Sequence, residues 1–183
     1  QEFFHDAEPA YDLTEPQVWD PMSVVFTSGT TGRAKAVVLP WGMEEAQRLV
    51  YGPEFRESVL YGYWPPFHTL GKSLLFIAAA WNGSLVTRER FSISDFWDDV
   101  RTYGCTTAFT VSVIAQLLYN QPPREDDADN PLEAVLMGPT IPQVDEFKRR
   151  FGVNVYTTFG STEIGSVLFS SMREVNSSNW QSS

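Results

Sequence analysis

Short apolar runs alternate along the chain with longer segments that place apolar residues on one face of a helix. Strands and helices of these lengths in alternation are typical of βαβ units. The pattern therefore predicts an α/β fold with a largely parallel sheet that is flanked by helices. The expected strands are 24–26, 36–39, 58–63, 84–86, 106–110, 133–137 and 153–158, and the expected helices are 42–51, 70–81, 94–103, 112–120 and 142–151.

The pattern also divides the chain into three parts. Residues 1–21 are acidic and rich in proline, so we expect a lead-in linker there. Residues 22–170 carry the regular elements and form the expected α/β core, whose first two strands predict a hairpin. Residues 171–183 are expected to be a polar tail. The stretch 121–131 is polar and acidic, and it predicts a solvated surface loop.

Composition narrows the function classes. Hydrophobic residues make up 43% of the chain, with 6 Trp and 13 Phe, which predicts a packed core. The formal net charge of −10 disfavours binding of nucleic acid, because a protein that contacts many phosphates needs a basic surface. A small phosphorylated ligand remains compatible with this charge, since it needs only a local cluster of donors.

Cysteine and histidine are scarce. Cys105 is the only cysteine, so no internal disulfide can form, and we read it as a core thiol. With only His5 and His68 beside it, a zinc site of the usual Cys/His type is not expected. No run approaches the roughly 18 apolar residues of a membrane-spanning helix. A single thiol suits a reducing compartment, and we expect a cytoplasmic protein.

The loop between the first two expected strands carries the chemistry. It offers hydroxyl donors, two glycines that let backbone N–H groups approach an anion, and two cations. These groups suit a triphosphate. The spacing of the glycines differs from that of a Walker A loop, which ends in Gly-Lys-Ser/Thr and is followed by a helix. The alternative to a phosphate-binding loop is a plain flexible turn. The residues are Thr27, Ser28, Gly29, Thr30, Thr31, Gly32, Arg33, Ala34 and Lys35.

This loop resembles the phosphate-binding signature of the adenylate-forming superfamily, which comprises acyl-CoA synthetases, peptide-synthetase adenylation domains and luciferases. The family pattern is Thr-Ser-Gly-Ser/Thr-Thr-Gly-x-Pro-Lys-Gly. The chain departs from it at Ala34, where the family has Pro, and at Ala36, where it has Gly. The resemblance implies that the loop binds ATP and that Lys35 takes part in catalysis.

Three further segments resemble family motifs in the same order, so the resemblance covers roughly residues 20 to 170. Residues 66–71 are similar to the segment whose histidine lies beside the carboxylate substrate, which implies a substrate-pocket role for His68. The alternative for His68 is an ordinary loop histidine. Residues 137–142 resemble the stretch along the adenine. That resemblance implies ATP contacts at Gly138, Pro139 and Thr140.

Residues 159–163 resemble the family's Tyr-Gly-x-Thr-Glu motif. The resemblance implies that Phe159 stacks on adenine and that Gly160 also lines the ATP site. It implies that Thr162 touches the α-phosphate and that Glu163 holds Mg²⁺, both as catalytic residues.

The resemblance implies ATP-dependent activation of a carboxylic acid to an acyl-adenylate, followed by transfer to CoA. The alternatives are an adenylation domain that loads a carrier protein, and a non-catalytic nucleotide-binding module. Residues 90–104 and 151–153 resemble the carnitine/crotonobetaine-CoA ligase type most.

The resemblance also implies that this sequence is part of the family's large N-terminal domain. The chain lacks an initiator Met, and the family's ribose-binding Asp, hinge and C-terminal Lys follow the Thr-Glu motif at a greater distance. We therefore expect these residues alone to be inactive. A partial sheet is further expected to expose apolar patches or edges that favour a homo-oligomer.

Overall fold

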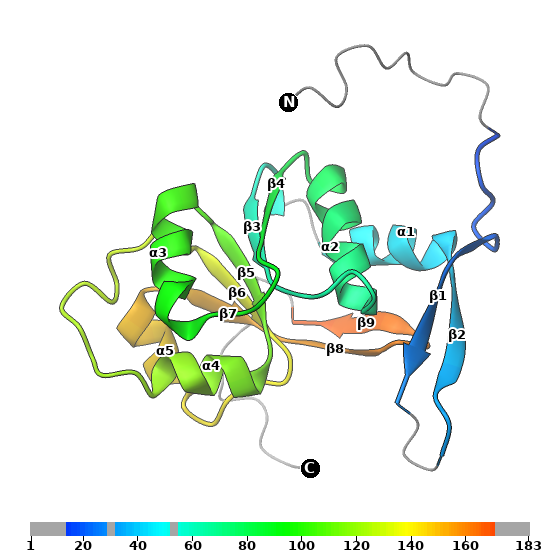
Figure 1. Cartoon of the computed structure of the whole chain (residues 1–183). Helices are drawn as coiled ribbons and strands as arrows, with labels where there is room; N and C mark the ends of the chain where they lie inside the picture. Colours follow the sequence, from blue (N-terminus) through cyan, green and yellow to red (C-terminus); the bar gives the residue numbers. More distant parts are fainter. Residues whose placement is uncertain (1–13, 29–31, 52–54, 171–183) are drawn as a thin grey trace, which may run out of the picture.

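The computed structural model describes residues 14–28, 32–51 and 55–170. A five-stranded sheet forms the centre, and two antiparallel ribbons lie at its side (Figure 1). No helix in these ranges is long and apolar enough to cross a membrane.

All neighbouring strands of the central sheet run parallel, in the order β4-β3-β5-β6-β7. The predicted α/β class and its largely parallel sheet are therefore confirmed. The strands are β3 (Val59–Gly62), β4 (Ser84–Thr87), β5 (Thr107–Thr110), β6 (Ala134–Met137) and β7 (Asn154–Tyr156).

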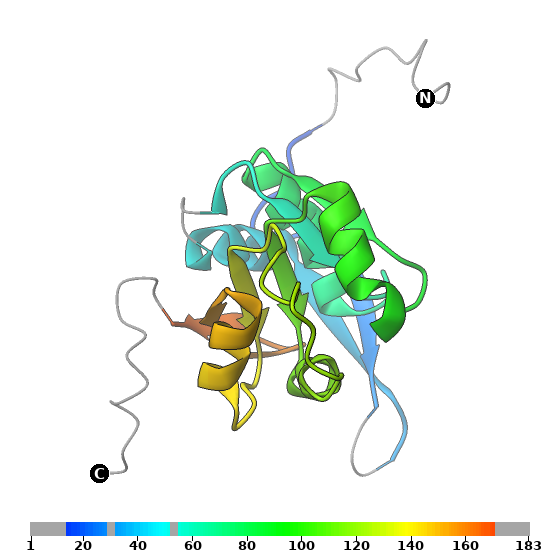
Figure 2. The same cartoon turned by 90° about the vertical axis from the view of Figure 1, so that its left-hand side faces the viewer.

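Helices cover both faces of this sheet. Helices α1 and α2 lie on one side, and α3, α4 and α5 lie on the other, which faces the viewer in Figure 2. Each predicted helix is present within a few residues of its expected bounds. They are α1 (Trp41–Val50), α2 (Thr69–Ala80), α3 (Ile93–Tyr103), α4 (Ser112–Tyr119) and α5 (Val144–Phe151).

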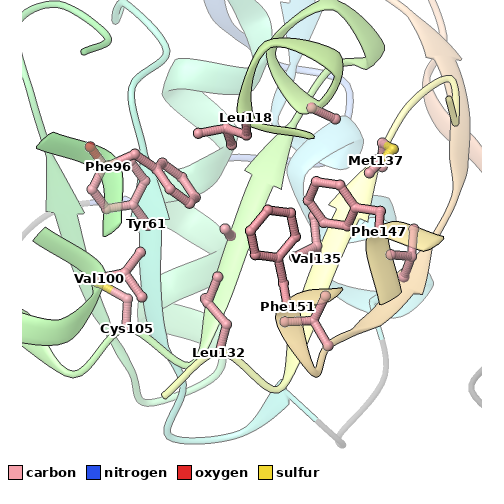
Figure 3. Packing of buried hydrophobic residues seen from close by; sticks show 14 of the residues in the cluster. Tyr61, Phe96, Val100, Cys105, Leu118, Leu132, Val135, Met137, Phe147 and Phe151 are labelled. Carbon is pink, nitrogen blue, oxygen red and sulfur yellow. The ribbon is translucent and has the colours of Figure 1, made fainter. Parts of the chain in front are cut away.

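The core has two parts, one on each face of the sheet. Alternate residues of β6 enter opposite clusters: Val135 packs on the side of α3 to α5, and Leu136 packs on the side of α1 and α2. Figure 3 shows the first cluster, with Phe147 of α5 beside Val135. Cys105 is fully buried there, as expected, and burial raises the pKa of its thiol to about 11.

The predicted hairpin is present as β1 (Pro21–Thr27) paired with β2 (Lys35–Pro40). Its outer face carries a stripe of exposed apolar side chains. Val24 and Val38 are opposite each other and about half exposed, and Phe26 is 69% exposed. The expected exposed apolar surface thus exists on this ribbon, whereas a homo-oligomer stays a prediction.

The second ribbon was not predicted. The expected strand 153–158 ends early as β7, and a new strand β8 (Thr158–Ser161) pairs with β9 (Gly165–Phe169). Glycine makes this close pairing possible, because a Cβ on Gly160 would lie 2.1 Å from the carbonyl oxygen of Gly165. The glycines interrupt the apolar alternation by which strands are recognised.

The prediction of a solvated loop over 121–131 was wrong in part. Asp127 is only 7% exposed and accepts a hydrogen bond of 2.7 Å from Arg150 Nε. Asn130 donates to the carbonyl oxygen of Phe151 and accepts from the backbone of Leu132. The loop is held against α5 by these bonds, so its acidic composition does not reflect full solvation.

Candidate functional site

A cavity of about 500 Å³ lies at the carboxyl ends of the central strands. Its walls include Thr110 at the end of β5, Gly138 after β6 and the first residues of α2. Ligands of open α/β sheets bind at this edge, because the loops that follow the strands converge there. The β8–β9 ribbon closes another side of the same cavity with Thr162 and Glu163.

The predicted phosphate-binding loop begins at this cavity, in the β1–β2 hairpin. Thr27 ends β1 and lines the cavity, and Lys35 is its partner in the strand register. Ser28 is exposed at the start of the loop, and Gly32 has φ of 155°, a conformation that favours glycine. The centre of the predicted loop, Gly29, Thr30 and Thr31, lies outside the described residues.

Glu163 is held as a carboxylate. The Ser161 hydroxyl donates to Glu163 Oε2 at 2.8 Å, and this bond, helped by the positive charge of Lys35, lowers the pKa of Glu163. Thr162 lies between Ser161 and Glu163 on the cavity wall.

This arrangement fits a magnesium ion that is bound mainly by a nucleotide. The described residues contain no cluster of three or more His, Cys, Asp or Glu side chains that could enclose a metal. Mg²⁺ in nucleotide sites typically takes one or two protein carboxylates and completes its shell with phosphate oxygens and water. An ionised Glu163 at the edge of a cavity has the chemistry that such a ligand needs.

His68 both caps a helix and lines the cavity. Its Nδ1 accepts a hydrogen bond of 3.1 Å from the backbone N–H of Leu70, so it is the N-cap of α2. Its ring lies 4.9 Å from that of Trp64. Partial desolvation of the ring lowers the pKa of His68 below its ordinary value of 6.5. The imidazole is therefore neutral near pH 7, with Nδ1 as an acceptor.

The lowered pKa of His68 makes the stability of the fold dependent on pH. As the pH falls below 6.5, the unfolded imidazole takes up a proton before the folded one does, which favours unfolding. The contribution of His68 is thus complete above pH 6.5 and declines as the pH approaches the lower folded pKa. We expect His68→Gln to reduce this part of the pH dependence of unfolding. Urea titrations between pH 5 and 8, with an NMR titration of the His68 ring, measure both effects; a folded pKa at or above 6.5 contradicts the account.

The residues that were predicted to contact adenine do not all line the cavity. Gly138 and Gly160 line the cavity, whereas Phe159 lies outside it with 64% of its surface exposed. Pro139 is not part of this wall, and Thr140 lines a second hollow beside α4. An exposed ring at Phe159 is free to stack on a base, and its role stays a prediction.

Sequence reasoning missed several residues of the cavity wall. Gln47 and Tyr51 at the end of α1 and Ser166 on β9 contribute to it, and Tyr51 Oη lies 3.0 Å from Ser166 Oγ. Gln47 was unexpected because polar residues of an amphipathic helix are normally assigned to solvent. Here the buried residues of α1 include Glu44 and Gln47, while Leu49 is 68% exposed.

Known proteins share this sequence pattern and fold. The model of a family described as AMP-binding enzyme matches residues 2–182. The medium/long-chain-fatty-acid–CoA ligase FadD17 of Mycobacterium tuberculosis is 41% identical over 154 residues, which are 80% of this chain and 30% of the ligase. Steroid-22-oyl-CoA synthetase of Rhodococcus jostii is 38% identical over 146 residues, 76% of this chain and 26% of that enzyme.

Among solved structures, o-succinylbenzoate CoA synthetase (MenE) of Bacillus subtilis in complex with ATP and magnesium ion superposes with a TM-score of 0.71. It is 23% identical and covers 90% of this chain and 36% of its own, so it supports the fold. The chain spans about a third or less of the length of these relatives. The match over nearly the whole chain, together with the identity to FadD17, shows that this chain belongs to the AMP-binding enzyme family.

Proposed function

We propose that the protein activates a carboxylic acid with ATP to form an acyl-adenylate and then transfers the acyl group to CoA. The observation that carries this proposal is one cavity at the carboxyl edge of the sheet. It is lined by Thr27 of the phosphate loop, by Thr162 and Glu163, and by His68. CoA as the acceptor is supported by the names of the relatives, which include fatty-acid and steroid CoA ligases.

The side chains of the cavity would have different roles in acyl-adenylate formation, according to their charge. A carboxylate oxygen of the acid forms a bond to the α-phosphorus of ATP, and the bond from that phosphorus to the bridging oxygen breaks, so that pyrophosphate leaves. Such a reaction depends on positioning and on stabilisation of negative charge. Lys35 and the loop after Thr27 would hold the departing phosphates. Thr162 would orient the α-phosphate, and Glu163 would hold the Mg²⁺ that neutralises phosphate charge.

His68 has a different role in this scheme. The nucleophile is already an ionised carboxylate, so the first step needs no general base. The neutral ring of His68 would instead form the wall beside the carboxylate, in an orientation fixed by its bond to Leu70.

A reducing compartment, such as the cytoplasm, suits a buried free thiol at Cys105, and we propose that the protein is located there.

The first test is exchange of labelled pyrophosphate into ATP by the full-length protein that carries these residues. We expect exchange that depends on an added carboxylic acid and on Mg²⁺, because acyl-adenylate formation is reversible. Mixtures of fatty, aromatic and steroid acids serve as the first substrates. Exchange that is equal with and without acids, in a protein that binds ATP, would point to a nucleotide-binding module without ligase activity.

A further inference from the structure

Three buried polar atoms in the cavity wall have no hydrogen-bond partner among the described residues. They are Gln47 Oε1, Thr69 Oγ1 and Trp64 Nε1. Gln47 is 3% exposed and Thr69 is 6% exposed, and all three residues line the same cavity. Unpaired buried polar atoms destabilise a folded protein. Their concentration in one wall points to a partner that the cavity receives.

The two helices that carry Gln47 and Thr69 are held together. Ser73 of α2 donates a hydrogen bond of 2.9 Å to Glu44 Oε1 of α1, with both residues buried. Gln47 follows Glu44 by about one turn, and Thr69 precedes Ser73 by about one turn. The hydrogen bond between Ser73 and Glu44 therefore fixes the part of the wall that carries these polar groups, and the groups are buried.

The amide of Gln47 also lies near the reacting end of the site. A Cβ placed on Gly165 would be 3.4 Å from Gln47 Nε2, and Gly165 follows Glu163 by two residues. The terminal torsion of a glutamine is broad, so its amide can turn toward a bound group at little cost. This amide therefore lies beside the segment that carries Glu163, where the proposed reaction would take place.

We propose that the acid activated here carries an uncharged hydrogen-bonding substituent, a hydroxyl or oxo group, which Gln47 and Thr69 recognise together with Trp64. This inference rests on the proposed function and adds the substrate class. A hydroxyl can donate to Gln47 Oε1 and accept from the Thr69 hydroxyl or the Trp64 indole, whereas an oxo group accepts from the last two. A purely hydrocarbon acid would leave all three atoms unpaired.

The remaining walls define the rest of the substrate. Tyr51, Leu70, Phe109 and Leu136 provide apolar and aromatic surface for a hydrocarbon or ring body. The described lining contains no Lys or Arg, and it does contain the carboxylate of Glu163. A second carboxylate or a sulfonate on the acid would find no cationic side chain in this lining, and burying an unpaired charge is costly. The recognised substituent is accordingly neutral.

The experiment compares matched acids in the full-length protein. Each pair differs by one hydroxyl or oxo group, on an alkyl chain, on an aromatic ring or on a steroid skeleton, and kcat/KM is measured by acid-dependent pyrophosphate release. We expect at least one pair to favour the substituted acid by about tenfold or more, because a site built for a hydroxyl rejects the analogue without it. Gln47→Met and Thr69→Val should remove most of that preference.

The same variants should raise the Tm of the ligand-free protein, since each removes an unpaired buried polar atom. Gln17→Met on the exposed surface is the matched control, and it should change neither the preference nor the Tm, because within the described residues only the backbone of Gln17 makes hydrogen bonds. Equal kcat/KM within every pair overturns the inference, as does an equal loss for both members of a pair in Gln47→Met.

If no acid gives pyrophosphate release, the proposed function fails, and calorimetric binding of the same pairs then decides the recognition step. A wild-type preference for the substituted acid that Gln47→Met abolishes supports the inference, and equal binding within every pair overturns it.

Discussion

Glu163→Gln and Lys35→Ala should each slow acyl-adenylate formation by roughly 10²- to 10³-fold, the range typical for loss of one preorganised group that stabilises charge. Glutamine keeps the size of Glu163 and its capacity to accept from Ser161, but it removes the negative charge that would bind Mg²⁺. Alanine at position 35 removes the cation that we propose holds the departing phosphates. Both variants should also weaken binding of Mg·ATP, which isothermal titration calorimetry measures directly.

The two effects should be less than additive in the double variant. The charge of Lys35 lowers the pKa of Glu163, so Lys35→Ala acts in part through the carboxylate. Glu125→Gln and Lys148→Ala are suitable charge-matched controls, because neither residue lines the cavity: Glu125 is on the loop before β6 and Lys148 is on α5. Unchanged affinity and rate in both site variants would remove Glu163 and Lys35 from the site.

The part of the fold that follows a simple period was predictable. The strands of the central sheet are short apolar runs, and the helices carry one apolar stripe. The pattern of buried positions therefore identifies both kinds of element in the sequence. The family-like segments lie at the ends of strands, and the parallel sheet brings those ends together. For this reason His68 and Gly138, which follow β3 and β6, line one cavity although they are far apart in the sequence, whereas Thr27 and Thr162 reach it from the two antiparallel ribbons.

What escaped prediction depends on contacts between distant residues. The ribbon β8–β9 needs the close approach of Gly160 to Gly165, and glycine leaves no apolar signal. Gln47 is buried because the β8–β9 ribbon and α2 cover its face of α1, which no local pattern in α1 reveals. The acidic loop 121–131 is held by Arg150, an interaction that composition cannot indicate.

Arg150→Met should lower the free energy of unfolding by about 3 kcal/mol, in the range for removal of one partner of a buried ion pair. Arg150 Nε donates to Asp127 Oδ2 at 2.7 Å, and its other nitrogens donate to the carbonyl oxygens of Tyr119 and Pro122 at 2.6 and 3.1 Å. The guanidinium also lies 4.8 Å from the ring centre of Phe151. Its loss leaves Asp127 buried without a counter-ion and frees the loop that joins α4 to β6.

The neighbouring arginine provides the control for this prediction. The Arg149 side chain is 71% exposed and pairs with Glu146 at 3.6 Å, so Arg149→Met should cost about 0.5 kcal/mol or less. Urea unfolding followed by circular dichroism compares the two variants. The double variant Arg150→Met, Asp127→Leu should recover part of the loss, since it removes the unpaired charge as well. If Arg150→Met is as stable as Arg149→Met, the loop is not held by this ion pair and its acidic residues act only as a solvated surface.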